Sequence, residues 1–360
     1  MTQSMATLYR LYGRGAVMVR QSFPGSCRVM SMDPRVQRVP GHVALPTGRK
    51  VTIVGAGSVG VAIGISLLAK NIADPLVLID IDGNRALGEV QDMQHASAFL
   101  DTQEIVGGND YRLTEGSRVC IVTAGARQKP GQSRTELLED NIKIMKHIIT
   151  ELMKYSPDTI IIVVSNPVDV LTYAAWKISG LPLNRVFGSG THLDSSRFQY
   201  FIGKLTGYPV HLVKAQILGE HGASCAPVWS GVNVAGLPIE RFGDLFTDEK
   251  KKDVFEQVLQ SVPELLRLKG YTSTAVGFTV ADQVESILFN KTKALPCSTL
   301  VKGFYGIEED VFLSLPCMLG NNGVSAVLPP DLNEQEKNLF KASADNMFKY
   351  QQEIDDIICK

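Results

Sequence analysis

The sequence predicts an α/β protein in which an N-terminal doubly wound parallel sheet is followed by a mixed α+β domain. Up to about residue 190, short apolar runs bounded by turn residues alternate with helical segments, and beyond it this alternation ends. The first pattern is typical of a parallel sheet covered on both faces. The length of 360 residues, 44% of them hydrophobic, is sufficient for two domains with separate cores. We expect domains over residues 50–190 and 191–360, preceded by a basic extension over residues 1–49.

Four β-branched runs are expected to form the first sheet, at residues 51–54, 76–80, 118–123 and 159–164. Helices are expected at about residues 59–70 and 137–155, because apolar side chains recur there at helical spacing. In the second domain, apolar residues predict a long helix through residues 254–266 with a kink at Pro263. A C-terminal helix is expected after residues 333–336, which resemble a capping box.

A glycine-rich fingerprint follows the first strand, and its sequence is Gly55-Ala56-Gly57-Ser58-Val59-Gly60. Gly55 allows a tight turn, Gly57 lets the backbone approach a pyrophosphate, and Gly60 permits close packing of helix on strand. The helix that starts at Ser58 and Val59 offers N–H groups and a positive dipole end to phosphates. Asp80 ends the next strand, where a carboxylate accepts hydrogen bonds from ribose hydroxyls and repels a 2′-phosphate. These features predict a Rossmann domain that binds NAD rather than NADP.

Two further segments follow predicted strands at the edge where α/β sheets bind ligands. The first runs from Thr123 through Gly125 to Arg134 and has the composition of a mobile lid, from which Arg134 would polarise a carbonyl. A solvated surface loop with incidental arginines is the alternative. The second contains Asn166, whose amide suits either a substrate oxygen or the nicotinamide ribose. Its alternative is an ordinary Asn-Pro turn residue.

A histidine in a glycine-flanked turn, His221, follows Asp194 and Arg197 in the second domain. Asp194 and Arg197 are three residues apart and share a face of a helix. Arg197 can hold a carboxylate through two parallel hydrogen bonds, and Asp194 can orient the imidazole and stabilise its charged form. His221 would then exchange a proton with a hydroxyl as a hydride moves. The alternatives are a surface ion pair and a structural histidine.

The overall composition excludes several other functions. The net charge of −1 gives no reason to expect nucleic-acid binding, and no apolar run approaches the ~18 residues of a membrane span. The six cysteines form no C-x-x-C pair, which argues for a reducing compartment and against a structural metal. His221 has no H-x-x-x-H partner, so we expect no metal site.

The first 50 residues differ in charge from the rest of the chain. They contain eight of the 36 Lys and Arg residues but one of the 37 Asp and Glu residues. An arginine-rich, acid-poor start that contains serines is typical of a mitochondrial presequence. We therefore expect a mitochondrial location, with a basic tail on a cytoplasmic enzyme as the alternative.

From about residue 50 to the C-terminus, the chain resembles the NAD-dependent L-lactate dehydrogenases, members of the lactate/malate dehydrogenase superfamily. The resemblance rests on the order and spacing of the glycine fingerprint, Asp80, the loop from Ala126 to Arg134, and these further segments: Ser165-Asn166-Pro167-Val168-Asp169, Leu193-Asp194-Ser195-Ser196-Arg197 and Gly219-Glu220-His221-Gly222. It implies that NAD is the cofactor, a small 2-keto or 2-hydroxy acid is the substrate, and the protein is a homo-oligomer, either a dimer or a tetramer.

The resemblance also implies residue roles. His221 is the expected proton donor and acceptor, Asp194 its orienting partner, and Arg134 the group that polarises the carbonyl. Arg197, Asn166 and Thr272 are expected to contact the substrate, and the expected cofactor contacts outside the fingerprint and Asp80 are Gly125, Arg127, Asn166 and Val276.

Gln128 and Thr272 favour pyruvate and L-lactate as the substrates. Related malate dehydrogenases have arginine at the position of Gln128, where it pairs with a second substrate carboxylate. Glutamine has no charge, so a dicarboxylate would be buried unpaired, and Thr272 leaves room for a methyl group. The alternatives are a malate or other 2-hydroxy-acid dehydrogenase and a non-catalytic NAD-binding paralogue. Four departures from the family pattern, His192, Ala223, Thr274 and Val276, suggest a divergent paralogue.

Overall fold

The computed structural model describes residues 37–38, 48–102, 104–126, 131 and 133–359. These belong to one compact unit, Arg35–Lys360. Of the predicted basic extension over residues 1–49, residues 1–36 and 39–47 lie outside the described residues. Among the helices that the structure describes, none is long and apolar enough to cross a membrane.

A sheet in the order β1-β15-β14-β13-β7-β6-β5-β2-β3-β4 forms the centre of the unit. Its parallel strands are β2 (Val51–Val54), β3 (Leu76–Ile79), β4 (Ile105–Gly108), β5 (Val119–Val122), β6 (Ile160–Val163) and β7 (Val186–Gly188). Its antiparallel strands are β13 (Lys293–Leu300), β14 (Phe312–Gly320), β15 (Gly323–Val327) and β1 (Gln37–Arg38). The direction of strand order reverses between β2 and β5, which places a ligand crevice at their carboxyl ends.

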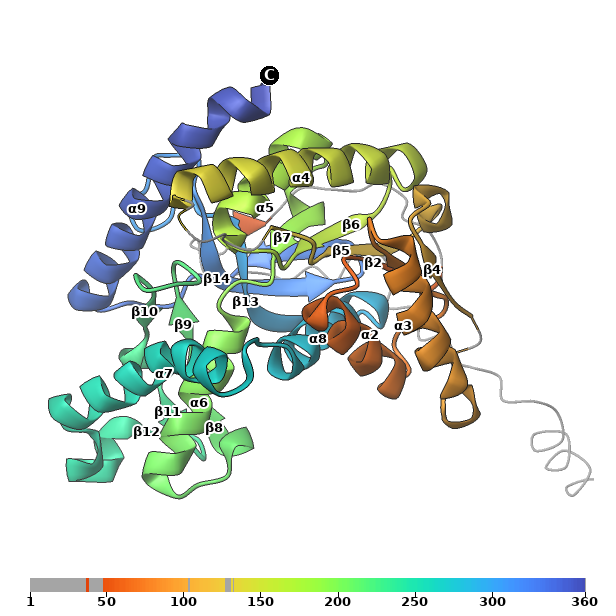
Figure 1. Cartoon of the computed structure of the whole chain (residues 1–360). Coiled ribbons are helices and arrows are strands. Elements are labelled where there is room, and N and C mark those ends of the chain that lie inside the picture. The colour runs from red at the N-terminus through yellow and green to blue at the C-terminus, as the bar shows by residue number, and fades with distance from the viewer. Residues whose placement is uncertain (1–36, 39–47, 103, 127–130, 132, 360) are drawn as a thin grey trace, which may run out of the picture. The chain divides into compact units, whose positions relative to one another are not determined.

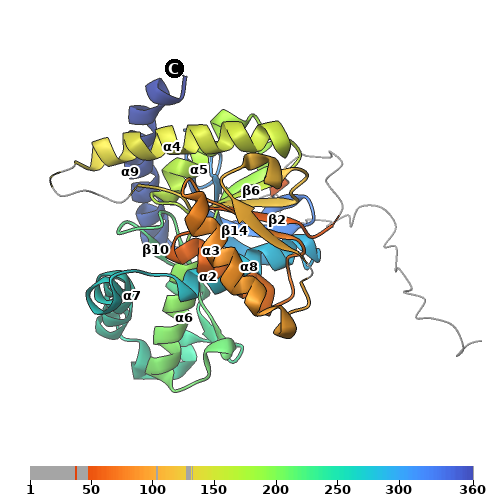
Figure 2. The same cartoon turned by 45° about the vertical axis from the view of Figure 1, so that its right-hand side comes forward.

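Helices cover both faces of this sheet, as expected for the doubly wound class (Figures 1 and 2). One face carries α4 (Arg134–Tyr155) and α5 (Val168–Ser179), with α9 (Glu334–Cys359) packed against both. The other face carries α2 (Ser58–Ala69), α3 (Gly83–His95) and α8 (Thr274–Leu288). The four predicted strands and the two predicted helices are confirmed. The sheet passes without a break from the first half of the chain into β13, β14 and β15.

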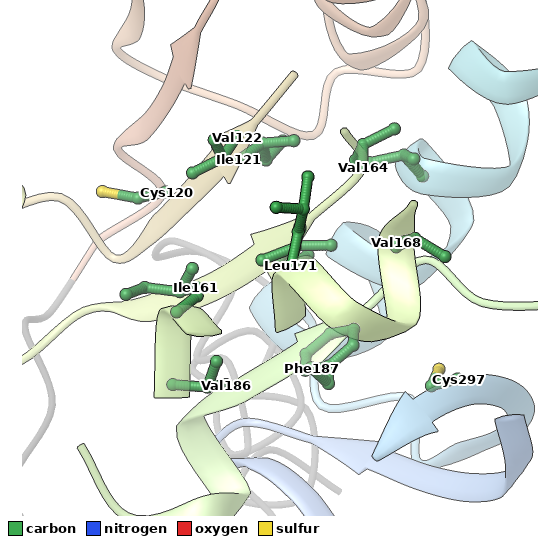
Figure 3. Packing of buried hydrophobic residues seen from close by; sticks show 14 of the residues in the cluster. Cys120, Ile121, Val122, Ile161, Val164, Val168, Leu171, Val186, Phe187 and Cys297 are labelled. Atoms are coloured by element: carbon green, nitrogen blue, oxygen red, sulfur yellow. The ribbon is translucent and has the colours of Figure 1, made fainter. Parts of the chain in front are cut away.

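The main core lies between the sheet and its helices. Figure 3 shows Val168 and Leu171 of α5 among apolar side chains of β5, β6 and β7. The central strands are buried at all four positions because helices exclude water from both faces. Each large aliphatic side chain that is fully buried in this way stabilises the fold by about 1.5–3 kcal/mol.

The second half of the chain adds a smaller lobe with a separate core around Phe198. Its elements are α6 (His192–Thr206), α7 (Asp248–Lys269), β8 (Val213–Lys214), β9 (Ile217–Leu218), β10 (Ala226–Pro227), β11 (Asn233–Val234), β12 (Leu237–Pro238) and the 3₁₀ segment η6 (Ile239–Phe246). Pro263 lies inside α7, which continues through it. The predicted capping box before α9 is confirmed, since Asn333 and Glu336 exchange side-chain to backbone hydrogen bonds of 2.9 and 3.0 Å.

Gly277 lets α8 pack closely on α2. A Cβ at Gly277 would lie 2.6 Å from the carbonyl oxygen of Ala62, so a side chain would push the helices apart. This contact brings the first residues of α8 to the carboxyl edge of the parallel sheet, beside the glycine-rich turn.

Candidate active site

A cavity of about 1150 Å³ opens at the carboxyl ends of the parallel strands. It is lined by residues that directly follow β2, β3, β5, β6 and β7, and also by residues of α6, α7, α8 and the turn that contains His221. The two halves of the chain therefore contribute to one cavity, at the edge where open α/β sheets bind ligands.

Two glycines of the glycine-rich turn are required by the fold, and the third leaves space for a ligand. Gly55 has φ +113°, and a Cβ at Gly60 would lie 1.9 Å from the carbonyl oxygen of Gly55. Both glycines are thus required by the fold itself. A Cβ at Gly57 would meet nothing within 4 Å, and its φ of −77° suits any residue. The absence of a side chain at Gly57 leaves room for a ligand that touches the backbone.

The start of α2 fits the pyrophosphate of a dinucleotide. No side chain caps this helix, so the backbone N–H groups of its first turn donate no hydrogen bond to a capping residue and remain available to a ligand. Ser58, Val59 and Gly60 in this turn line the cavity, where free N–H groups and the helix dipole attract phosphate. These features match the predicted role of the fingerprint.

Asp80 lies at the opposite side of the turn, after β3, and lines the cavity. Its Oδ2 accepts a hydrogen bond of 2.6 Å from the backbone N–H of Ala56, and its Oδ1 accepts one of 2.9 Å from Asp82. These bonds hold the carboxylate in place. Its remaining lone pairs can accept hydrogen bonds from ribose hydroxyls, as the sequence predicts.

His221, Asp194 and Arg197 form a connected group in the second half of the chain. Nδ1 of His221 lies 2.5 Å from Oδ2 of Asp194, and Nη1 of Arg197 donates to Oδ1 of Asp194 at 3.0 Å. The Asp194 and Arg197 side chains are each only 12% exposed. The alternative of a solvated surface ion pair is therefore wrong. His221 and Arg197 both line the cavity.

The electrostatics of this group favour a charged imidazole. Burial alone would lower the pKa of His221, but the Asp194 carboxylate outweighs burial and raises that pKa above its ordinary value. Burial would raise the pKa of Asp194, but the neighbouring imidazole and the Arg197 guanidinium lower it. Asp194 stays ionised and keeps a proton on Nδ1, which leaves Nε2 as the nitrogen for exchange.

The structure places most of the other predicted site residues around the same cavity. Gly125, Asn166, Thr272 and Val276 all line it. Arg134 is the first residue of α4. Two predictions, the roles of Arg127 and Gln128, concern residues outside the described part of the chain.

Sequence reasoning missed Asn141, a supporting residue on α4. It is 3% exposed; its Oδ1 accepts from the backbone N–H of Ala126 at 2.7 Å, and its Nδ2 donates to the carbonyl oxygen of Asn166 at 3.4 Å. It joins the segments that follow β5 and β6. The sequence signal for this role was an amide side chain next to the apolar face of the helix predicted over residues 137–155. A buried amide there needs hydrogen-bond partners from other segments of the chain.

Two family comparisons cover nearly the whole described chain. Residues 49–188 match the lactate/malate dehydrogenase NAD-binding domain, and residues 191–357 match the lactate/malate dehydrogenase alpha/beta C-terminal domain. The chain belongs to the lactate/malate dehydrogenase family. Its first domain is accordingly an NAD-binding domain, and the chain is an NAD-dependent oxidoreductase.

Individual members of the lactate/malate dehydrogenase family give the same result. The chain is 49% identical to the L-lactate dehydrogenase A chain of Ambystoma mexicanum over 313 residues, covering 86% of this chain and 94% of that one. It is 50% identical to the A chain of Danio rerio over 326 residues, covering 88% and 98%. Among solved structures, a lactate dehydrogenase enzyme from a Medee basin deep-sea metagenome library superposes with a TM-score of 0.83 at 35% identity, covering 85% and 99% of the two chains.

Of the four residues that depart from the expected family pattern, Val276 lines the cavity. Ala223 and Thr274 are exposed. His192, the first residue of α6, places Nε2 3.3 Å from Asp282 of α8. This contact ties the helix that carries Asp194 to the helix that carries Val276.

Proposed function

We propose that this protein is an L-lactate dehydrogenase that reversibly interconverts pyruvate and L-lactate with NAD. The observation that supports this most directly is the His221–Asp194–Arg197 group, which faces the same cavity as the glycine-rich turn. A proton-exchanging imidazole and a guanidinium clamp beside a dinucleotide site suit a small 2-keto acid better than any other substrate class.

The residues of the chain provide binding and proton transfer. Arg197 holds the substrate carboxylate, and its bond to Asp194 fixes the plane of the guanidinium. When bound, the reduced cofactor NADH would supply a hydride to the keto carbon, and the oxidised cofactor NAD⁺ would accept one from the hydroxy carbon. As the keto carbon gains the hydride, the keto oxygen takes the proton from Nε2 of His221, and the reverse reaction returns that proton. Asp194 stabilises the imidazolium, and Arg134 polarises the carbonyl.

Gln128 and Thr272 set the substrate preference in this proposal. Thr272 lines the cavity and is small enough to admit a methyl group. Gln128 offers no charge for a second carboxylate, so oxaloacetate would bury an unpaired anion at a cost of several kcal/mol. We therefore expect a higher kcat/KM for pyruvate than for oxaloacetate or for branched 2-keto acids.

The decisive experiment follows the absorbance of NADH with the purified full chain and a panel of 2-keto acids. Pyruvate-dependent oxidation of NADH that is lost in His221→Ala supports the proposal. A higher kcat/KM for oxaloacetate would make the protein a malate dehydrogenase instead. NADH binding without turnover of any substrate would indicate a non-catalytic paralogue.

We also propose that the chain forms a homo-oligomer, a dimer or a tetramer. The mutually packed helices α2 and α8 leave Ile65 54% exposed and Phe278 56% exposed. Large apolar side chains on one helix pair are typical of surfaces that a second subunit covers. Sedimentation velocity on the full chain tests this: the wild type should sediment as an oligomer and Phe278→Asp as a smaller species. A wild-type monomer at micromolar concentration would refute it.

We further propose that the protein is located in mitochondria. The arginine-rich and acid-poor composition of residues 1–50 supports this location. A fluorescent fusion of residues 1–50 should accumulate in mitochondria, and a variant with its arginines changed to glutamine should not. Diffuse cytoplasmic fluorescence of the unchanged fusion would favour the alternative of a basic tail.

A further inference from the structure

A buried carboxylate outside the mechanism described above lies behind the His221 turn. Asp169, the second residue of α5, is 2% exposed. Its Oδ2 accepts a hydrogen bond of 2.9 Å from the backbone N–H of His221, and its Oδ1 accepts one of 2.6 Å from the hydroxyl of Ser298 on β13. The side chain therefore joins three elements that are distant in sequence, namely α5, β13 and the turn that contains His221.

Close packing makes this junction possible. Gly188 of β7 pairs in register with Ser298, and a Cβ at Gly188 would lie 2.9 Å both from Cβ of Ser298 and from Cγ2 of Val168. With no side chain there, the start of α5 reaches β13, and Asp169 comes within hydrogen-bond distance of Ser298. One oxygen of the Asp169 carboxylate is thus held by Ser298, and the other oxygen accepts from His221.

The ionised form of Asp169 has three sources of support. The Ser298 hydroxyl and the His221 N–H both donate to it, and it lies in the first turn of a helix, where the dipole favours negative charge. Burial opposes ionisation and raises the pKa of Asp169 to about 6. At neutral pH the group is therefore mainly an anion, and its charge acts in surroundings that screen it weakly.

The charged groups that face His221 come from three elements. Asp194 and Arg197 come from α6, Asp169 comes from α5, and Glu220 precedes His221 in its own turn, where it lies near Asp169. Asp194 acts on the imidazole ring, whereas Asp169 acts on the backbone of the same residue. The two carboxylates thus approach His221 from different elements and restrain different parts of it.

We propose that Asp169 is a positioning residue for His221. It fixes the turn that contains His221 by accepting a hydrogen bond from the backbone of that residue, and it adds a second negative charge that favours the imidazolium. The proposal rests on the proposed function for its consequence in catalysis. In pyruvate reduction, the imidazolium is the reactive form, so Asp169 extends activity toward higher pH. In lactate oxidation, the neutral form is needed, so Asp169 shifts the onset of activity toward higher pH.

Asp169→Asn removes the negative charge of the side chain while keeping its size and its hydrogen-bond partners. The amide oxygen of the new side chain can still accept from His221, and its NH₂ group can donate to the Ser298 hydroxyl, which accepts as well as donates. The matched control is Asp310→Asn, which removes the same charge from an exposed carboxylate whose partner is Lys302 at 2.9 Å. Ser298→Ala, which leaves the charge but removes one hydrogen bond, serves as the second variant should Asp169→Asn fail to fold.

The first measurement is an NMR titration of the His221 imidazole in ¹⁵N-histidine-labelled full chain, assigned by its loss in His221→Gln. We expect Asp169→Asn to lower the pKa of His221 by about half a unit or more, Ser298→Ala to lower it by less, and Asp310→Asn to leave it unchanged. An unchanged pKa in Asp169→Asn, or in Ser298→Ala where that variant must stand in, would overturn the proposal. This readout does not depend on catalysis, so it holds even if the proposed reaction fails.

The second measurement is the pH profile of kcat/KM in both directions. In Asp169→Asn, the alkaline limb of pyruvate reduction and the acidic limb of lactate oxidation should both move to lower pH by the shift seen in the titration. A uniform loss of activity without movement of either limb would show a structural role only and would contradict the proposal. An inactive wild type would instead refute the proposed function.

Discussion

Oδ2 of Asp194 lies 2.5 Å from Nδ1 of His221, while the other oxygen of the same carboxylate accepts a hydrogen bond from Arg197. One buried aspartate therefore orients both the group that exchanges a proton and the group expected to bind the substrate. A change at Asp194 should alter both proton transfer and substrate binding.

Asp194→Asn should lower kcat for pyruvate reduction by roughly 10²–10⁴-fold, because the imidazolium loses its main partner. The pKa of His221 is raised by this carboxylate, so the variant should lose pyruvate reduction at a lower pH than the wild type. Steady-state kinetics across pH check this. An unmoved alkaline limb would mean that Asp194 does not set the charge of His221.

Arg197→Lys should raise KM for pyruvate by about 10²-fold, since lysine cannot form two parallel hydrogen bonds to a carboxylate. The affinity for NADH, measured by fluorescence titration, should stay unchanged because Arg197 belongs to α6 rather than to the glycine-rich turn. Weakened NADH binding of similar size would show that the variant disturbs the whole cavity.

Gly57→Ala and Gly60→Ala form a matched pair. A Cβ at Gly60 would lie 1.9 Å from the Gly55 carbonyl oxygen, so Gly60→Ala should lower the free energy of unfolding by about 1–3 kcal/mol or more. A Cβ at Gly57 meets no protein atom within 4 Å, so Gly57→Ala should keep its Tm without cofactor but weaken NADH binding by about tenfold or more. Equal losses of Tm would contradict this division.

Asp169→Asn should be more stable than the wild type at neutral pH. Burial raises the pKa of Asp169 from 3.8 to about 6, so the folded state binds more protons than the unfolded state between these values, and stability falls as pH rises through them. Asparagine has no charge to bury, so the variant should gain up to about 3 kcal/mol above pH 6 and nothing at low pH. Urea denaturation at a series of pH values checks this; a difference that does not vary with pH would refute it.

The gain in stability and the expected change in His221 would together mean that the buried charge is kept for the reaction and not for the fold. Such a site weakens the folded state while it prepares a reactive group.

The sequence by itself determined four strands of the parallel sheet, the helices α2, α4, α7 and α9, the glycine-rich turn and the identities of His221, Asp194 and Arg197. These follow from local rules, because apolar spacing and glycine placement act within a few residues of the chain. Local rules also predicted the capping box at Asn333 and Glu336, which is a contact between near neighbours.

Only the tertiary structure decided which polar groups support the site. For Asp194 the sequence left a surface ion pair open as an alternative. For Asp169 it predicted no role, since the partners of this side chain lie 52 and 129 residues away. Asn141 likewise joins segments that meet only when the sheet has formed. The physical reason is that a buried polar side chain needs hydrogen-bond partners, and the folded chain supplies them from segments that are distant in sequence. The spacing of residues along the chain does not show which distant segments come together.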